Sequence, residues 1–135
     1  DANVVVYAAS HTRYKPASLA VLTAVHTHGL GTTSVLALEE VWHLEHTGRV
    51  PEIAGATARA LEVFRSPLPL TTRVLRAALA LEAKGVGTAD MIHIATCIDA
   101  GITDIVTADR AFDNAPGLRR IDPLDEVAID RLLAP

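Results

Sequence analysis

Apolar residues recur along most of the chain at the three- and four-residue spacing of an α-helix. This spacing predicts helices over residues 16–29, 34–48, 51–64, 71–84 and 124–133. The second helix has the clearest limits, because Ser34 is a favoured N-terminal cap and Gly48 a favoured stop. Its predicted apolar side consists of Val35, Leu38, Val41, Trp42 and Leu44. Residues 3–9 are too short a run to distinguish a helix from a strand.

The segment of residues 87–113 predicts a helix followed by a strand. Thr88 is expected to cap the helix, and Asp90 lies in its first turn, where the helix dipole favours a negative charge. Residues 102–108 are rich in β-branched side chains and predict a short buried strand with Asp109 at its carboxyl end. Ligands bind at that end of the strands in open α/β sheets. The segment therefore offers two acids that can meet.

Together these elements predict one domain over residues 1–135, with residues 118–121 as a last edge strand. Many helices with few short strands fit a three-layer α/β domain, in which helices cover both faces of a short sheet. If Asp1 stands at the end of a first strand, the apolar residues of that strand lie upstream of it. We therefore expect a first strand to precede the supplied chain.

Composition restricts the class of function. The net charge is −4 and the pI is near 5.8, so nucleic acid would have to be bound by local arginines and not by a global positive field. No apolar run approaches the roughly 20 residues that a membrane span needs. The single cysteine, Cys97, lies in the apolar run of its helix, which fits a reducing compartment. We expect a cytoplasmic protein without a membrane partner.

Four acids stand where a small α/β domain could gather them, namely Asp1, Glu40, Asp90 and Asp109. Carboxylates with water are the ligands of Mg²⁺ or Mn²⁺, ions that also bridge phosphate oxygens. Crowded carboxylates repel one another unless a cation neutralises them. Such a centre converts water into a nucleophile and stabilises the charge of a phosphodiester under attack. The implied reaction is phosphodiester hydrolysis.

Each acid alone has a simpler interpretation. Asp90 could only favour its helix N-terminus, Glu40 could be a solvated residue on a helix face, and Asp109 could only begin a turn. The order of the acids along the chain is more specific than any one of them.

Four blocks of sequence carry a resemblance to a known family: DANVVVYA, TSVLALEEVWHL, GTADMIHIATCIDAG and IVTADRAFD. In this order and spacing the chain resembles PIN-domain proteins, and most of all the VapC-type toxins of bacterial toxin–antitoxin pairs. The last two blocks are the most specific.

The resemblance implies a compact α/β/α fold with a short, mainly parallel central sheet. It also implies an endoribonuclease that depends on Mg²⁺ or Mn²⁺, with RNA as substrate, an antitoxin protein as partner and a homodimer as assembly. By position it assigns four catalytic and metal-binding acids, a further acid sometimes found in the site and two supporting polar residues: Asp1, Glu40, Asp90 and Asp109, then Asp113, then Asn3 and Thr107.

Alternatives remain for several of these residues. The second acid could be Glu39, which faces about 100° away from Glu40 on a helix; Glu40 is preferred because apolar residues follow it directly, as in the family. Glu40 and His43 form a Glu-x-x-His pair, but a di-iron centre needs two such motifs and only one exists. His93, one turn after Asp90, is predicted to be a packed, hydrogen-bonded histidine near the site.

Substrate contacts are harder to assign. Arg110, beside Asp109, could hold a phosphate with its fork of donors. Further arginines could extend a path for RNA, although scattered arginines are usually solvated surface: Arg73, Arg76, Arg119 and Arg120. Few aromatic residues are present to stack bases, so RNA as substrate rests on the resemblance.

Two other classes of protein compete with a nuclease. A phosphoryl-handling enzyme of the haloacid-dehalogenase or receiver type also begins with an acid after a first strand. The dehalogenase type needs a second Asp where Asn3 stands, and both need a matching lysine, for which Lys84 is the only candidate outside the Lys15 region. The second competitor is a non-catalytic PIN-like domain that only binds other proteins. Intact acids argue against it.

Overall fold

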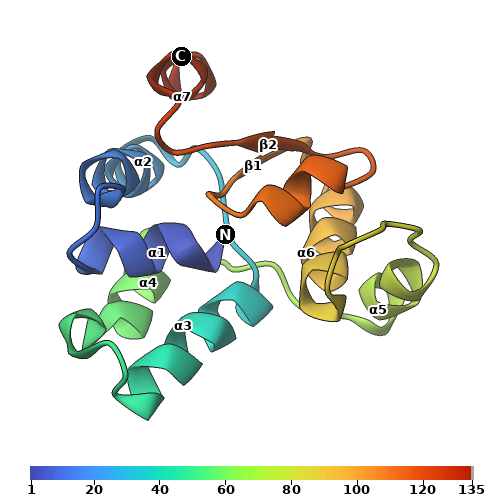
Figure 1. The fold of residues 1–135 in the computed structure, drawn as a ribbon, viewed down its shortest axis with the longest axis horizontal. Helices are drawn as coiled ribbons and strands as arrows, with labels where there is room; N and C mark the ends of the chain where they lie inside the picture. Colours follow the sequence, from blue (N-terminus) through green and yellow to red (C-terminus); the bar gives the residue numbers. More distant parts are fainter. Residues whose placement is uncertain (135) are drawn as a thin grey trace.

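The computed structural model describes residues 1–134, and helices account for most of them (Figure 1). The elements in chain order are α1 (Ala2–Ala9), α2 (Lys15–His28), α3 (Val35–Thr47), the 3-10 helix η1 (Pro51–Ile53), α4 (Ala56–Phe64), α5 (Thr72–Leu79), α6 (Thr88–Asp99), β1 (Asp104–Val106), the 3-10 helix η2 (Arg110–Asn114), β2 (Arg119–Ile121) and α7 (Glu126–Leu133). No helix in this part of the chain has the length and the apolar character needed to cross a membrane.

The strands form a short parallel sheet between two groups of helices. β1 pairs with β2 so that Ile105 lies opposite Arg120. Successive side chains of β1 point to opposite faces, as strand geometry requires. Ile105 packs in the cluster that contains Ile94 of α6, whereas Val106 packs against the cluster formed by α1, α2, β2 and α7. The fold is therefore a helix-rich α/β/α arrangement with a two-stranded parallel sheet, as predicted.

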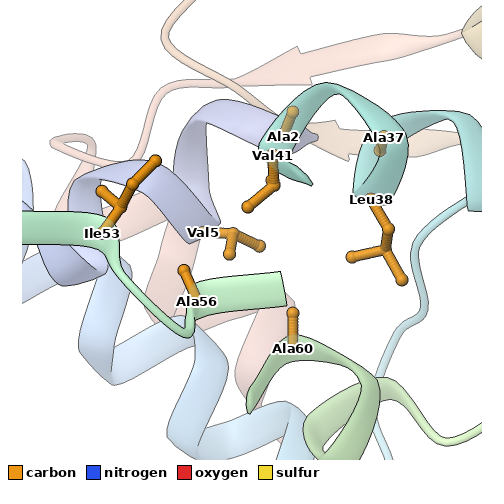
Figure 2. Close-up of a cluster of buried hydrophobic side chains, with 8 residues drawn as sticks. All are labelled: Ala2, Val5, Ala37, Leu38, Val41, Ile53, Ala56 and Ala60. Atoms are coloured by element: carbon orange, nitrogen blue, oxygen red, sulfur yellow. The ribbon is translucent and has the colours of Figure 1, made fainter. Parts of the chain in front are cut away.

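A second part of the core joins α1, α3 and α4 (Figure 2). Val41 and Ile53 are completely buried there, and Val5 of α1 points into the same cluster. This packing explains why residues 3–9, which the sequence left undecided, form a helix. An eight-residue helix is marginal alone, so the apolar face that α1 buries against its neighbours stabilises it.

Several helix ends lie where the sequence predicted them. The Ser34 hydroxyl accepts a hydrogen bond from the Ala37 N–H at 3.0 Å, which caps α3. Gly29 and Gly48 follow α2 and α3 with φ of 67° and 65°, in the left-handed region that favours glycine. Thr71 caps α5 by accepting from the Val74 N–H.

Other limits differ from the prediction. The helix predicted over residues 51–64 is divided into η1 and α4 at Gly55, whose φ is 76°. The Glu45 carboxylate caps the start of α4, because it accepts a hydrogen bond from the Gly55 N–H at 2.6 Å and another from the Thr57 hydroxyl at 2.7 Å. α5 ends at Leu79, short of residue 84. The strand predicted over residues 102–108 is reduced to the three residues of β1.

The predicted apolar faces also need correction. Leu38 and Val41 are buried in the core, but Val35 and Trp42 are 50% and 58% exposed. These two side chains are not part of the cluster that α3 forms with α1 and α4. Thr88 does not cap α6, because Gly87 occupies the N-cap position and no side chain there accepts a hydrogen bond.

Candidate metal centre

Three of the four acids lie at the start of a helix. Asp1 is the N-cap of α1, and its carboxylate accepts from the Ala2 N–H at 2.7 Å. Asp90 lies in the first turn of α6. Asp109 is the N-cap of η2 and accepts from the Ala111 N–H at 2.8 Å. Free backbone N–H groups and the helix dipole favour a negative charge at each of these positions.

The fourth acid, Glu40, projects from the middle of α3 and contacts His93 of α6. Its Oε1 is 3.0 Å from Nε2 of His93. On the other side of the ring, Nδ1 of His93 is 3.3 Å from the Ser34 hydroxyl oxygen. Glu39 is exposed to solvent, so Glu40 is the glutamate of this pair that faces the other acids.

Asp1, Glu40 and His93 form a compact group. Each offers one ligand atom, and these atoms all lie within 4.8 Å of one another. Within residues 1–134 this is the group of acids and histidine close enough to share one ion, and Asp90 and Asp109 do not join it at that spacing. His93 thus takes a place in the group that the sequence analysis had given to an acid.

Asp90 is nevertheless close to the group. Partial burial raises the pKa of its carboxyl, and the negative charges of Asp109 and Glu40 raise it further, while His93 acts in the opposite direction. The charges of these groups therefore act on one another across α3, α6 and the end of β1. The structure gathers all four predicted acids in one region.

Thr107 connects three of the predicted residues. It follows β1, is fully buried, and its hydroxyl donates to Oδ2 of Asp1 at 2.8 Å. The same oxygen accepts from the Asn3 side-chain amide at 2.9 Å and from the Asp109 N–H at 3.1 Å. Because both lone pairs receive a donor, the single hydroxyl hydrogen is directed at Asp1. Thr107 therefore fixes the orientation of Asp1 relative to the start of η2.

Asp113 lies apart from this group in an ion pair. Its Oδ1 accepts from Nε of Arg120 at 2.6 Å, and it is half exposed. Arg120 also donates to Asp122 at 3.2 Å and to the Thr107 carbonyl at 3.1 Å. Asp113 is therefore joined through Arg120 of β2 to Thr107, the residue that orients Asp1.

The arginines considered for RNA binding differ in their surroundings. Arg73 and Arg119 are paired with Asp99 and Asp104 at 2.8 and 2.6 Å, and Arg120 is mostly buried. Arg110 is exposed next to Asp109, at the start of η2. Of the arginines considered from the sequence, Arg110 is the one beside an acid of the site.

His93 and Ser34 are the site residues that sequence reasoning did not assign. His93 was predicted to be packed and hydrogen-bonded, which is confirmed, since it is 4% exposed and has two partners. The sequence did indicate that His93 lies near the site, because it follows Asp90 by three residues, one helical turn along the same face. The contact with Glu40 could not be found this way, because it joins α6 to α3.

The residues present fit a divalent cation. In the described part of the chain no lysine or arginine side chain forms an ion pair with any of the four acids. The Asn3 side-chain oxygen is buried without a hydrogen-bond partner beside this network. Carboxylate oxygens with one imidazole nitrogen are a donor set for divalent ions. The excess negative charge is a feature that a bound cation would neutralise.

The raised pKa of Asp90 predicts a pH-dependent effect of Asp90→Asn on stability without metal. A carboxyl whose folded pKa lies above its unfolded pKa favours folding while protonated, and this contribution is lost as pH rises through the folded value. The stability of Asp90→Asn relative to the wild type should therefore increase between pH 3 and pH 7. The change should stay below about 1 kcal/mol, because solvent screens the carboxyl. Chemical unfolding at several pH values in EDTA measures it.

Asp113→Asn is the matched control for this effect. That substitution removes a partner of Arg120, so it should destabilise the protein at pH 7 instead. A relative stability of Asp90→Asn that falls as pH rises would contradict the raised pKa that burial and the neighbouring acids give Asp90.

The comparison with family models places this arrangement in a known class. The model of the PIN domain matches residues 1–118, which include all four acids and Thr107. The comparisons with curated proteins and with solved structures gave no match. The match covers most of the chain, and the α/β/α fold agrees with it. The chain belongs to the PIN domain family.

Proposed function

We propose that this protein is a divalent-metal-dependent endoribonuclease that acts as the toxin of a type II toxin–antitoxin pair in the cytoplasm. PIN domains are in general metal-dependent nucleases. The observation that carries the proposal is the convergence of Asp1, Glu40 and His93 within 4.8 Å, with Asp90 and Asp109 close by. The resemblance of the four sequence blocks to VapC-type toxins supports the choice of RNA and the toxin role.

In this proposal the carboxylates of Asp1, Glu40, Asp90 and Asp109 hold the ion. When bound, a divalent cation supplies a water of lowered pKa and neutralises charge on the phosphate. The chain itself supplies orientation. Thr107 directs Asp1, and Nε2 of His93 lies 3.0 Å from Oε1 of Glu40. Because these residues come from α1, α3, α6 and the end of β1, folding alone assembles the site.

Glu40 and Asp90 have a further role in this proposal. A carboxylate close to the others, but not required for every coordination position, can accept the proton of the attacking water. Arg110, exposed beside Asp109, is placed to donate hydrogen bonds to a phosphate oxygen.

The partners follow from the same site. An antitoxin would cover the acids, with a lysine or arginine placed among them as a substitute for the cation. We propose a homodimer as the assembly on the basis of the resemblance alone.

The test is to sequence the RNA ends produced by the protein with Mn²⁺ or Mg²⁺. We expect discrete new ends with the wild type, and none with Asp90→Asn or with EDTA. Mn²⁺ should also raise the melting temperature of the wild type more than that of Asp90→Asn, since an ion that binds only the folded state stabilises it.

Equal cleavage by Asp90→Asn would refute the assignment of the site. An absence of cleavage together with no melting shift would instead favour a PIN domain that only binds protein partners.

A further inference from the structure

We infer that His93 is a ligand of the metal, and that its imidazole makes the site select a first-row transition ion such as Mn²⁺ over Mg²⁺. The inference rests on the proposed metal site and specifies the class of ion that it takes. It starts from the position of Nε2, the ring atom that faces Glu40 at 3.0 Å and belongs to the compact group with Asp1.

The spacing of the donor atoms suits a shared ion. Ligands held at about 2.1 Å from one small divalent ion lie about 3 to 4 Å from each other. The 3.0 Å between Nε2 of His93 and Oε1 of Glu40 falls in this range, and the whole group spans no more than 4.8 Å. A small inward movement of side chains would bring all three donors onto one ion.

The other ring nitrogen of His93 has the partner that a metal ligand requires. A ligating histidine usually donates its second ring N–H to an oxygen, which fixes the tautomer and leaves the first nitrogen free for the metal. Nδ1 of His93 is 3.3 Å from the Ser34 hydroxyl oxygen. Ser34 is itself held in place, because it caps α3 by accepting from the Ala37 N–H. In this tautomer Nε2 presents a lone pair toward the acids.

The surroundings of His93 keep its Nε2 directed at the acids. The residue is 4% exposed and begins the buried run of α6 from His93 to Thr96, so its ring is held away from solvent. With Nε2 unprotonated, the nitrogen and the Glu40 oxygen face each other with lone pairs, and a cation between them removes the repulsion. A buried imidazole in contact with an acid that lacks an arginine or lysine partner is therefore suited to share that acid's metal.

The nitrogen determines the preference. Mg²⁺ is a hard ion that takes oxygen ligands, whereas imidazole favours transition ions, and affinity for nitrogen-containing sites rises along the series from Mn²⁺. A site made only of carboxylates would bind Mg²⁺ and Mn²⁺ with a smaller difference. We therefore expect the wild type to bind Mn²⁺ more tightly than Mg²⁺ by at least about tenfold.

The direct test is pulsed electron paramagnetic resonance of the Mn²⁺ complex. We expect modulation from a directly bound imidazole nitrogen in the wild type, and the altered pattern of nitrogen-15 when the protein is grown with nitrogen-15 histidine. His93 is the histidine in the compact group, so this readout needs no substitution. A Mn²⁺ complex without nitrogen modulation, or no Mn²⁺ binding, would overturn the inference.

The second test compares His93→Gln with the wild type by titration calorimetry with Mn²⁺ and Mg²⁺. Glutamine keeps an N–H near the position of Nε2, so it can still donate to Glu40, but it lacks the ring lone pair. We expect the Mn²⁺ affinity to fall at least about tenfold and the Mg²⁺ affinity to change much less. An unchanged ratio of the two affinities would show that His93 only positions Glu40. His43→Gln, at an exposed position of α3, is the matched control.

These results separate this inference from the proposed function. Nitrogen coupling in a protein that cuts no RNA would support the ligand and refute the nuclease. RNA cleavage by a protein whose Mn²⁺ complex lacks nitrogen coupling would support the nuclease and refute His93 as a ligand.

Discussion

Glu40→Gln is expected to reduce RNA cleavage by at least about 100-fold, whereas Glu39→Gln should leave the rate within about twofold of the wild type. The two residues are adjacent on α3, carry the same charge and differ in direction. Glu40 contacts His93 at 3.0 Å and faces the acids, while Glu39 is exposed to solvent. Glutamine preserves the shape of the side chain but removes its negative charge. That charge is the property that attracts a cation.

The measurement is the initial rate of cleavage of a labelled RNA at saturating Mn²⁺, with melting temperatures to verify folding. Both variants should melt within a few degrees of the wild type, since neither side chain is a core residue. Equal activity of Glu40→Gln and the wild type would remove Glu40 from the site. A comparable loss in Glu39→Gln would show that the overall charge of α3 matters, and not the geometry of one carboxylate.

This pair also shows what sequence could and could not determine. The choice of Glu40 over Glu39 followed from the family resemblance, in which apolar residues directly follow the glutamate, and the helical repeat then required the two side chains to point in different directions. The sequence did not identify the partner of Glu40, because His93 lies on α6 and a side-chain contact between α6 and α3 is not encoded in any local pattern. Helix faces are predictable from periodicity, while contacts between distant helices depend on the whole fold.

The elements of the fold divide in the same way. Caps and stops are local, so Ser34, Gly29 and Gly48 were placed correctly. Residues 3–9 were undecided because a short apolar run fits both states, and burial against α2, α3 and α4 stabilises it as a helix. Trp42 was assigned to a buried face on its apolar character, yet it is 58% exposed, since hydrophobic residues are common on protein surfaces.

Thr107 is a second case in which the structure adds to the sequence. The resemblance marked it as a supporting polar residue, and the structure shows the physical basis, which is one hydroxyl bonded to three partners. From the sequence alone, a threonine at the end of a strand rich in β-branched residues is indistinguishable from an ordinary strand residue. Its role depends on α1 and η2 both approaching the end of β1.

Thr107→Val is accordingly expected to destabilise the protein by about 1–3 kcal/mol and to weaken Mn²⁺ binding. Valine has nearly the volume of threonine, so packing is conserved and the loss comes from the hydroxyl. Three partly buried groups lose their contact with the fully buried Thr107 hydroxyl: the Asp1 carboxylate, the Asn3 amide and the Asp109 N–H. Oδ2 of Asp1 then loses the donor that orients it. Binding of Mn²⁺ must order this carboxylate, which lowers the affinity for the ion.

Thr107→Ser is the matched control, because it keeps the hydroxyl and removes only a methyl group, at a cost of about 1 kcal/mol. Serine should therefore retain the Mn²⁺ affinity of the wild type, while valine loses it. Urea unfolding in EDTA gives the stabilities, and Mn²⁺ calorimetry gives the affinities of the same three proteins. A serine variant that binds Mn²⁺ as weakly as the valine variant would mean that the methyl group, through packing, sets the position of Asp1 and that the three hydrogen bonds do not.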